Sequence, residues 1–256
     1  MESIDPGAYR SIVVLTGAGL SVASGIKPFR GPGGLWNDGT LVRLSHIDTF
    51  MRDPDSVWSF WGEARIDAAR AEPNSAHLAL AEFERSLPEN SRFLLATQNV
   101  DGLHLRAGSR RVAELHGRVR RTRCSDPECA LEPFDDDESY SGGTPRCPLC
   151  GSPLRPDIVF FGETLGPEGR EAAAAVASCD LFIAAGTSGT VWPAADYARK
   201  AAVSGARTIF VNLEPLDPPV PWFREIRLGR AEEILPELLG VRMDARSGNA
   251  RQKMLS

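Results

Sequence analysis

Four short apolar runs recur along the chain, and small or polar residues follow each of them in place of an ordinary turn. The runs cover residues 12–15, 92–96, 181–185 and 208–211. Continuous apolar runs of this length are typical of strands that are buried on both faces of a parallel sheet. Segments with helical spacing separate them. The alternation predicts an α/β fold whose parallel sheet is covered by helices on both faces.

The segments between the runs carry the start signals of helices. Asp53 and Asn74 are good N-caps, and apolar residues follow each of them at helical spacing. We expect helices over residues 54–70, 74–87, 167–178, 193–203 and 231–239. The polar residues 1–10 are expected to be frayed, and residues 241–256 are expected to form a disordered tail.

The polar ends of the four runs indicate a ligand site. In open α/β sheets, ligands bind beyond the carboxyl ends of the strands. The first run leads into Gly17-Ala18-Gly19, whose small residues let the backbone approach a ligand, and the N–H groups of a following helix favour a pyrophosphate. The dehydrogenase pattern fails, because Val22 replaces its third glycine. A bare GxG also fits a turn without a ligand, but four polar strand ends together favour a nucleotide held in a non-standard way.

Composition narrows the class of protein. The chain has 256 residues, 42% of them hydrophobic and 25% charged, which allows one large α/β domain or a large domain with a small insert. Its net charge of -5 argues against nucleic acid as a global partner. The N-terminus lacks a secretion signal, and no apolar run approaches the roughly 18 residues of a membrane span. We therefore expect a cytoplasmic protein that does not insert into membranes.

Four of the five cysteines lie close together in the sequence as two pairs, Cys124-x4-Cys129 and Cys147-x2-Cys150. Two pairs at such spacings make two chelating corners of a tetrahedron, and four sulfurs leave no open position for water. The pattern predicts a structural zinc ion and not a catalytic one. Four unrelated cysteines are the competing interpretation. Cys179 stands alone and is expected to be a small core residue.

Arginines cluster just before the first cysteine pair. Such a cluster could contact nucleic acid or an acidic partner, but it more often forms a solvated rim that nearby carboxylates balance, here the acidic run 135–138. The cluster consists of Arg118, Arg120, Arg121 and Arg123.

One of the four histidines is a candidate for chemistry. His46 and His77 are expected to be surface or capping residues. His116 lies between a polar strand end and the cysteine module, where a general base would stand if those modules bounded a cleft. From its spacing alone, a structural role for His116 remains open.

Taken in order, these segments resemble the sirtuin signature from about residue 10 to residue 240. The matching blocks are Gly17-Ala18-Gly19-x-Ser21-x-x-Ser24-Gly25-Ile26-x-x-Phe29-Arg30, Gln98-Asn99-Val100-Asp101, Leu115-His116-Gly117, the four cysteines, Phe161-Gly162-Glu163, Gly186-Thr187-Ser188 and Asn212-Leu213-Glu214. The resemblance implies a Rossmann-like large domain and a small domain made of a zinc ribbon and a helical insert. The implied large domain covers residues 10–36, 76–118 and 157–240, and the small domain covers residues 37–75 and 119–156.

The resemblance also implies an activity, that of an NAD-dependent protein lysine deacylase, with acetyl the expected acyl group. NAD is consumed, nicotinamide and O-acyl-ADP-ribose are released, and His116 acts as general base on a ribose hydroxyl. The implied partners are acyl-lysine proteins or peptides, and we expect a monomer.

Residue roles carry over from the same resemblance. It assigns Gly17, Ala18 and Gly19 to the cofactor pyrophosphate, Ser21 to cofactor binding, and Phe29 and Arg30 to a flexible cofactor loop. It assigns Gln98, Asn99 and Asp101 to the nicotinamide and its ribose, with Asn99 catalytic beside His116. It assigns Gly186, Thr187, Ser188, Asn212, Glu214 and Ala231 to the adenosine half. The acyl-lysine would lie against Trp61, Val159, Phe160, Phe161, Gly162 and Glu163.

The sequence departs from the desuccinylases of this family. Those enzymes bind the acyl carboxylate with a Tyr-x-x-Arg pair, whose positions hold Trp61 and Ala64 here. Arg65 follows one position later and would point about 100° away on a helix. A carboxylate without its arginine is disfavoured in an apolar tunnel, so acetyl or another uncharged acyl group is expected. Ala23, where many members carry Glu, has no assigned consequence.

Two other functions remain open. The same site would suit an ADP-ribosyltransferase or plain NAD glycohydrolase. It would also suit a catalytically idle sensor of NAD or ADP-ribose, although a sensor has no use for a general base.

Overall fold

Six parallel strands form the main sheet, in the order β3-β2-β1-β7-β8-β9. Their bounds are β1 Ser11–Thr16, β2 Arg92–Thr97, β3 Val112–Glu114, β7 Leu181–Ala185, β8 Arg207–Asn212 and β9 Glu225–Leu228. The computed structural model describes residues 3–28, 34, 39–189 and 191–242. Strand β1 is central, and its Val14 pairs with Leu95 of β2 and Ile183 of β7. The predicted parallel sheet is confirmed.

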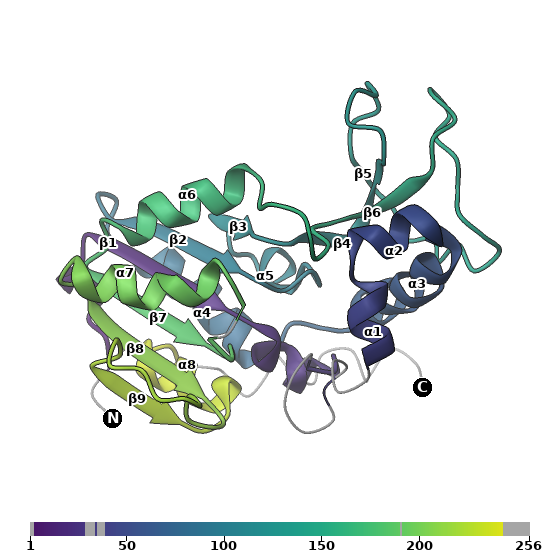
Figure 1. The fold of residues 1–256 in the computed structure, drawn as a ribbon. Helices are drawn as coiled ribbons and strands as arrows, with labels where there is room; N and C mark the ends of the chain where they lie inside the picture. Colours follow the sequence, from purple (N-terminus) through teal and green to yellow (C-terminus); the bar gives the residue numbers. More distant parts are fainter. Residues whose placement is uncertain (1–2, 29–33, 35–38, 190, 243–256) are drawn as a thin grey trace, which may run out of the picture.

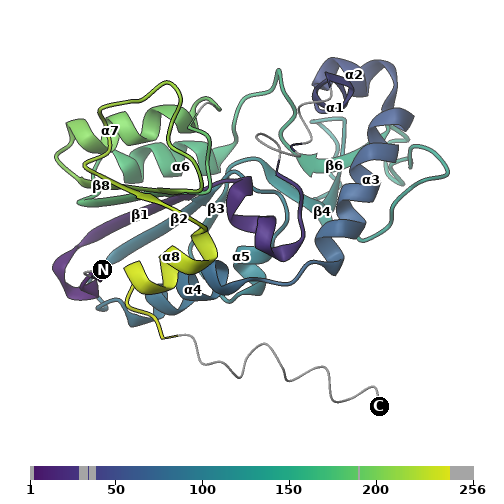
Figure 2. The same cartoon turned by 90° about the horizontal axis from the view of Figure 1, so that it is seen from below.

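Helices cover both faces of this sheet, as the apolar runs predict. Alternate residues of β1 point to opposite faces because the side-chain period of a strand is two. Ile12 and Val14 belong to the core under α4 (Ser75–Ser86) and α8 (Ala231–Leu238). Val13 and Leu15 belong to the core under α6 (Pro167–Val176) and α7 (Tyr197–Val203). Figure 2 shows the two helix pairs on opposite sides of the strands.

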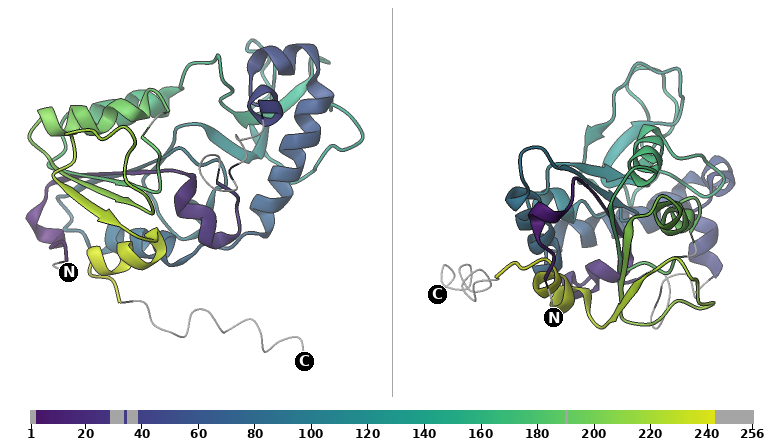
Figure 3. Two further views of the ribbon diagram at one scale, coloured as in Figure 1. Left: turned by 60° about the horizontal axis from the view of Figure 1, so that its bottom comes forward. Right: turned by 90° about the vertical axis from the view of Figure 1, so that its left-hand side faces the viewer.

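A second, smaller group of elements lies beside the main sheet (Figures 1 and 3). It contains the antiparallel sheet β5-β4-β6 and three helices. The bounds are α1 Gly39–Leu44, α2 Ile47–Arg52, α3 Pro54–Arg70, β4 Gly117–Cys124, β5 Phe134–Asp135 and β6 Leu154–Ile158. Helix α3 is tied to β6 because the indole Nε1 of Trp58 donates to the carbonyl of Leu154 at 2.8 Å. The domain boundaries stated above stay a prediction.

Several elements differ from the sequence expectations. The helix expected after β1 is a seven-residue 3-10 helix, η2 (Ala18–Ser24). The frayed N-terminus is wrong for the described residues, because Ile4 is buried and its N–H donates to Leu238. The remaining short elements are η1 Pro6–Ala8, α5 Leu103–Arg106 and η4 Ala194–Asp196. Most of the expected tail, residues 243–256, lies outside the described residues. Within the described residues, we find no helix with the length and apolar character needed to cross a bilayer.

Candidate active site

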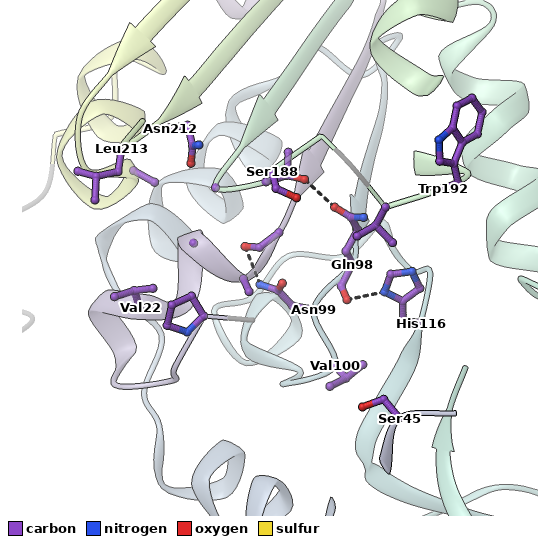
Figure 4. A pocket seen from close by; sticks show the side chains of 18 of the residues that line it. Val22, Ser45, Gln98, Asn99, Val100, His116, Ser188, Trp192, Asn212 and Leu213 are labelled. Atoms are coloured by element: carbon purple, nitrogen blue, oxygen red, sulfur yellow. Dashed lines mark hydrogen bonds between the residues drawn. The ribbon is translucent and has the colours of Figure 1, made fainter. Parts of the chain in front are cut away.

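A cavity of about 720 Å³ lies where β1, β2, β7 and β8 end, and it extends to the smaller group of elements. This volume suits a small-molecule site. Gln98 and Asn99 follow β2, Gly186 follows β7, and Asn212 closes β8. Figure 4 shows Asn212 and Leu213 on one side of the cavity and His116 and Trp192 on the other. The predicted convergence of polar strand ends is therefore observed.

Glycines let two of these strand ends pack against each other. The N–H of Gly19 donates to the carbonyl of Gly186 at 2.9 Å. A Cβ added to Gly17 would lie 2.8 Å from that carbonyl oxygen. Gly186 has φ +62°, and a Cβ there would lie 2.3 Å from the nitrogen of Leu20. The Gly-x-Gly motif thus has a packing role at this junction, in addition to any approach to a ligand.

The Gln98–Asn99 turn is fixed from several sides. The Gln98 N–H donates to the carbonyl of Thr16, and its side-chain Oε1 accepts from the Thr187 hydroxyl, both at 2.9 Å. The Asn99 amide donates to the Gly17 carbonyl at 3.1 Å and to Ser21 Oγ at 3.0 Å. Since both side chains are held by the protein, they present a preorganised polar surface to the cavity.

Ser21 and Asp101 lie behind this surface and do not line the cavity. The Ser21 hydroxyl donates to Asp101 Oδ2 at 2.7 Å, and the N–H of Leu103 donates to Asp101 Oδ1 at 2.9 Å. Burial raises the pKa of Asp101 above its ordinary value. In this structure both residues support Asn99, so their predicted direct contacts with the cofactor stay a prediction.

His116 has the tautomer that a general base needs. Its Nδ1 lies 2.8 Å from the backbone carbonyl of Gln98 (Figure 4). A carbonyl only accepts, so Nδ1 carries the proton and Nε2 keeps a free lone pair. Burial lowers the pKa of His116, and the hydrogen bond to Gln98 offsets part of that effect. The imidazole is therefore neutral, and able to take a proton, near pH 7.

The segment after β6 forms the opposite wall. The N–H of Val159 donates to the carbonyl of His116 at 2.9 Å, and that of Phe161 donates to Ser45 at 2.8 Å. Phe160 is buried and its ring contacts that of Trp61, with centroids 6.5 Å apart. The indole Nε1 of Trp61 donates to the carbonyl of Leu44 at 3.2 Å. This end of the cavity is thus an apolar slot with fixed walls.

Glu163 lines the cavity but is held by the protein. Arg155 contacts both carboxylate oxygens at 2.7 Å, and the N–H of Phe160 donates to Glu163 Oε2 at 2.8 Å. The guanidinium also lies 4.3 Å from the centroid of the Phe160 ring. Glu163 therefore helps to fix the wall of the cavity, and its carboxylate is already paired with Arg155.

Arg65 points away from the cavity, as its helical position predicts. It is fully buried and lies 3.1 Å from a carboxylate oxygen of Asp136. Its Nε donates to the carbonyl of Val119 at 2.8 Å. Trp61 faces the cavity one turn earlier on α3.

The four paired cysteines bring their sulfurs together. All four Sγ atoms lie within 4.8 Å of one another, with Cys124 and Cys150 at 3.5 Å and Cys129 and Cys147 at 3.6 Å. Around a zinc ion with Zn–S bonds of about 2.3 Å, neighbouring sulfurs stand roughly 3.8 Å apart. The set therefore fits a tetrahedral, closed zinc site. Cys179 is buried beside β7, as expected.

The other predicted groups have structural partners. His46 caps α2 by accepting from the N–H of Asp48, and His77 belongs to a capping box on α4. The arginine rim faces carboxylates, but only in part those of the expected acidic run. Arg120 pairs with Asp137 of that run, whereas the shortest ion pairs of the other arginines are Arg118–Glu114, Arg121–Asp157 and Arg123–Asp157.

Most of the predicted site residues that the structure describes line this cavity. They are Gly17, Ala18, Gly19, Trp61, Gln98, Asn99, His116, Val159, Phe160, Phe161, Gly162, Glu163, Gly186, Thr187, Ser188, Asn212, Glu214 and Ala231. Phe29 and Arg30 lie outside the described residues. Ser45 and Leu165 line the cavity without having been predicted, and no sequence pattern marks them, because tertiary packing alone brings them there.

Comparisons with known proteins find similar chains. The model of the Sir2 family matches residues 17–193. An NAD-dependent protein deacylase of Vibrio parahaemolyticus is 41% identical over 233 residues, covering 90% of this chain and 94% of the relative. One from Thermus thermophilus is 46% identical over 210 residues, covering 80% of each chain.

Solved structures are similar over nearly the whole chain. A Sir2 homologue in complex with NAD has a TM-score of 0.82 at 38% identity, covering 92% of this chain and 90% of that one. A Sir2 structure with a deacetylated p53 peptide and 3′-O-acetyl ADP-ribose has a TM-score of 0.81 at 33% identity, covering 92% of this chain and 96% of that one.

Proposed function

This chain belongs to the Sir2 family, and from that premise we propose that it is an NAD-dependent protein lysine deacetylase that works at the cavity around His116. Deacylation that depends on NAD is the activity by which its relatives are named. Bound NAD supplies a ribose carbon whose bond to nicotinamide breaks during the reaction. One water molecule is consumed, and the products are nicotinamide, the free lysine and O-acetyl-ADP-ribose.

The cavity supports a division of labour among the predicted residues. The glycine junction of Gly17, Gly19 and Gly186 lines the cavity and would face the pyrophosphate. Asn212 and the residues near it would hold the adenosine half. Gln98 and Asn99 would hold the nicotinamide and its ribose, with Ser21 and Asp101 supporting them from behind. His116 would accept the proton of a ribose hydroxyl at Nε2.

The observation that carries this proposal is the position of His116. Its Nδ1 is bonded to Gln98, which belongs to the polar strand ends, and its own carbonyl binds Val159, which begins the apolar wall. A single imidazole thus joins the predicted cofactor half and the predicted acyl-lysine half of one cavity.

The proposal can be tested with an acetyl-lysine peptide incubated with and without NAD. Deacetylation should require NAD, and His116→Ala should abolish it while the fold and the zinc content stay unchanged. Deacetylation without NAD, or full activity of His116→Ala, would refute the proposed mechanism.

We further propose that acetyl is preferred over succinyl. Among the described residues that line the cavity, the one cation is Arg230, which adjoins Ala231 at the end assigned to adenosine. Trp61 occupies the apolar slot and Arg65 points away from it, so a succinyl carboxylate would be buried without a partner. Kinetics on acetyl and succinyl forms of one peptide check this. We expect a kcat/KM at least about 100-fold higher for acetyl, since an unpaired charge costs several kcal/mol; a better rate on succinyl would contradict it.

The acyl-lysine would be presented by a protein or peptide partner, and a solved Sir2 structure that contains a deacetylated p53 peptide supports this. We propose that the protein acts as a monomer in the cytoplasm. The four cysteine thiols that fit zinc support a reducing compartment. The net charge of -5 and the carboxylates that face the arginine rim make nucleic acid an unsuitable partner.

A further inference from the structure

Two buried histidines stand behind the site, and the proposed mechanism uses neither. His77 lies on α4 and His104 on α5, with exposed fractions of 0% and 2%. Their ring centroids are 4.8 Å apart, at an interplanar angle of 52°. Within the described residues, His77 Nε2 and His104 Nδ1 have no hydrogen-bond partner. Two buried polar rings in contact call for an explanation, because each unpaired nitrogen is costly.

Hydrogen bonds fix the tautomer of His104. The hydroxyl of Thr16 donates to Thr97 Oγ1 at 2.9 Å, and the backbone N–H of Asn99 donates to the same Thr97 oxygen at 3.1 Å. His104 Nε2 lies 2.9 Å from Thr16 Oγ1. Since the single hydroxyl proton of Thr16 is used toward Thr97, its oxygen accepts from His104. His104 therefore carries its proton on Nε2, and Nδ1 is a bare acceptor.

His77 has the complementary arrangement. Its Nδ1 accepts from the backbone N–H of Asn74 at 3.3 Å, so its proton is on Nε2. The unpaired atoms of the two rings are thus a donor on His77 and an acceptor on His104. The Asn74 side chain also donates to the carbonyl of Leu20 and to Ser24 Oγ, at 2.8 and 3.0 Å. Hydrogen bonds therefore link His77 to η2 through Asn74, and His104 to the Asn99 turn through Thr16 and Thr97.

Both rings are neutral. Burial lowers the pKa of His77 to about 3. Burial, followed by the neighbouring His77, lowers the pKa of His104 well below its ordinary value. A neutral imidazole can hold a directional hydrogen bond at each nitrogen, whereas a charged one would be a donor at both.

We propose that His104 is a positioning residue for Asn99, which it holds in place through the hydroxyls of Thr16 and Thr97. The inference rests on the proposed function, because it assigns Asn99 to the nicotinamide half of NAD. Since Gly186, Asn212 and the adenosine end take no part in the chain of bonds, loss of His104 should slow turnover more than it weakens ADP-ribose binding.

Two conservative variants separate positioning from simple packing. In His104→Gln the amide nitrogen reaches the place of Nε2 and can still donate to Thr16, whereas in His104→Asn it reaches only the place of Nδ1. We expect His104→Gln to keep kcat within about threefold of wild type and His104→Asn to lose roughly tenfold, as for a lost buried hydrogen bond. The Kd for ADP-ribose, measured by calorimetry, should change less than about threefold in both. Equal kcat in the two variants, or a parallel loss of ADP-ribose binding, would overturn the proposal.

A second pair tests the other end of the chain and does not depend on how His104 variants fold. Thr97→Ser keeps the hydroxyl and should retain activity, whereas Thr97→Val should lose roughly tenfold in kcat. The double variant His104→Asn with Thr97→Val should be no slower than the slower of the two single variants, because both substitutions interrupt the same chain of hydrogen bonds. Additive losses would contradict the proposal. An inactive wild type would refute the proposed function instead, so the two failures are distinguishable.

Discussion

At the scale of single residues, the site depends on side chains that other groups hold in one orientation. His116 shows this most clearly, since its bond to Gln98 fixes which nitrogen can take a proton. Asn99 is held in the same way by Gly17 and Ser21. Preorganised groups of this kind lose little free energy to reorientation when the reaction occurs.

The pKa of His116 leads to a prediction about pH. Burial lowers it below the ordinary value of about 6.5. The neutral base form is present above the pKa and is lost as pH falls through it, so the acid limb of kcat/KM should have its midpoint below about 6.5. The pH profile of kcat/KM for NAD with a saturating acetyl-peptide checks this. A midpoint above that value would mean that His116 is not the base, or that burial does not govern its pKa.

Sequence patterns predict most of the residues that line the cavity, but not the contacts that hold them there. Ser21 and Asp101 belong to matched motifs, yet the structure places both behind the cavity wall. Their position depends on how η2 packs against the Asn99 turn, and local sequence patterns do not predict tertiary packing. The orientation of Arg65 followed from helical geometry, because the period of a helix does not depend on tertiary context.

At the scale of elements, the central strands were predictable and the edge strands were not. Strands β1 and β7 are buried along their whole length and read as continuous apolar runs. Strand β9 lies at the sheet edge, where Ile226 and Leu228 are exposed, and β3 has three residues. Their sequences therefore lack the pattern of a buried strand. No local sequence pattern marks the segment after β1 as a 3-10 helix. A tertiary contact holds it, because the side chain of Asn74, the N-cap of α4, donates to the carbonyl of Leu20.

Helix α3 is tied to the smaller sheet by a buried ion pair, which leads to a stability prediction. Arg65 and Asp136 have side-chain exposures of 0% and 6%. Arg65→Met would leave the Asp136 carboxylate without its cation and should cost about 3–5 kcal/mol of unfolding free energy. Arg120→Met is the matched control, because its pair with Asp137 is exposed and should cost less than about 1 kcal/mol. Urea unfolding of both variants measures this, and equal losses would contradict the account.

The cysteine cluster should hold the smaller sheet together. Its core is small, with Cys124, Cys147 and Leu154 as the buried residues. We expect about one zinc ion per chain by elemental analysis, and chelation should lower the melting temperature by several degrees because metal binding supplies folding free energy. Cys150→Ser should lose zinc, whereas Cys179→Ser, whose sulfur is remote from the cluster, should keep it. A protein that folds equally well without zinc would contradict this role.

At the scale of the whole molecule, one cavity receives residues from both groups of elements. The chain passes between them repeatedly, and the passages at His116 and Val159 carry site residues. The apolar slot around Trp61 comes from the smaller group, whereas the glycine junction and Gln98 come from the main sheet. Chemistry at the junction should therefore require both ligands, the nucleotide from one side and the acyl-lysine from the other.

The most direct test of this account is nicotinamide release from NAD, measured with and without an acetyl-lysine peptide, together with the mass of the ADP-ribose product. We predict that release depends on the peptide, in a one-to-one ratio with deacetylated lysine, and that the product carries the acetyl group. Release at the same rate without peptide, yielding plain ADP-ribose, would contradict it and identify a glycohydrolase; no release under either condition would identify a sensor.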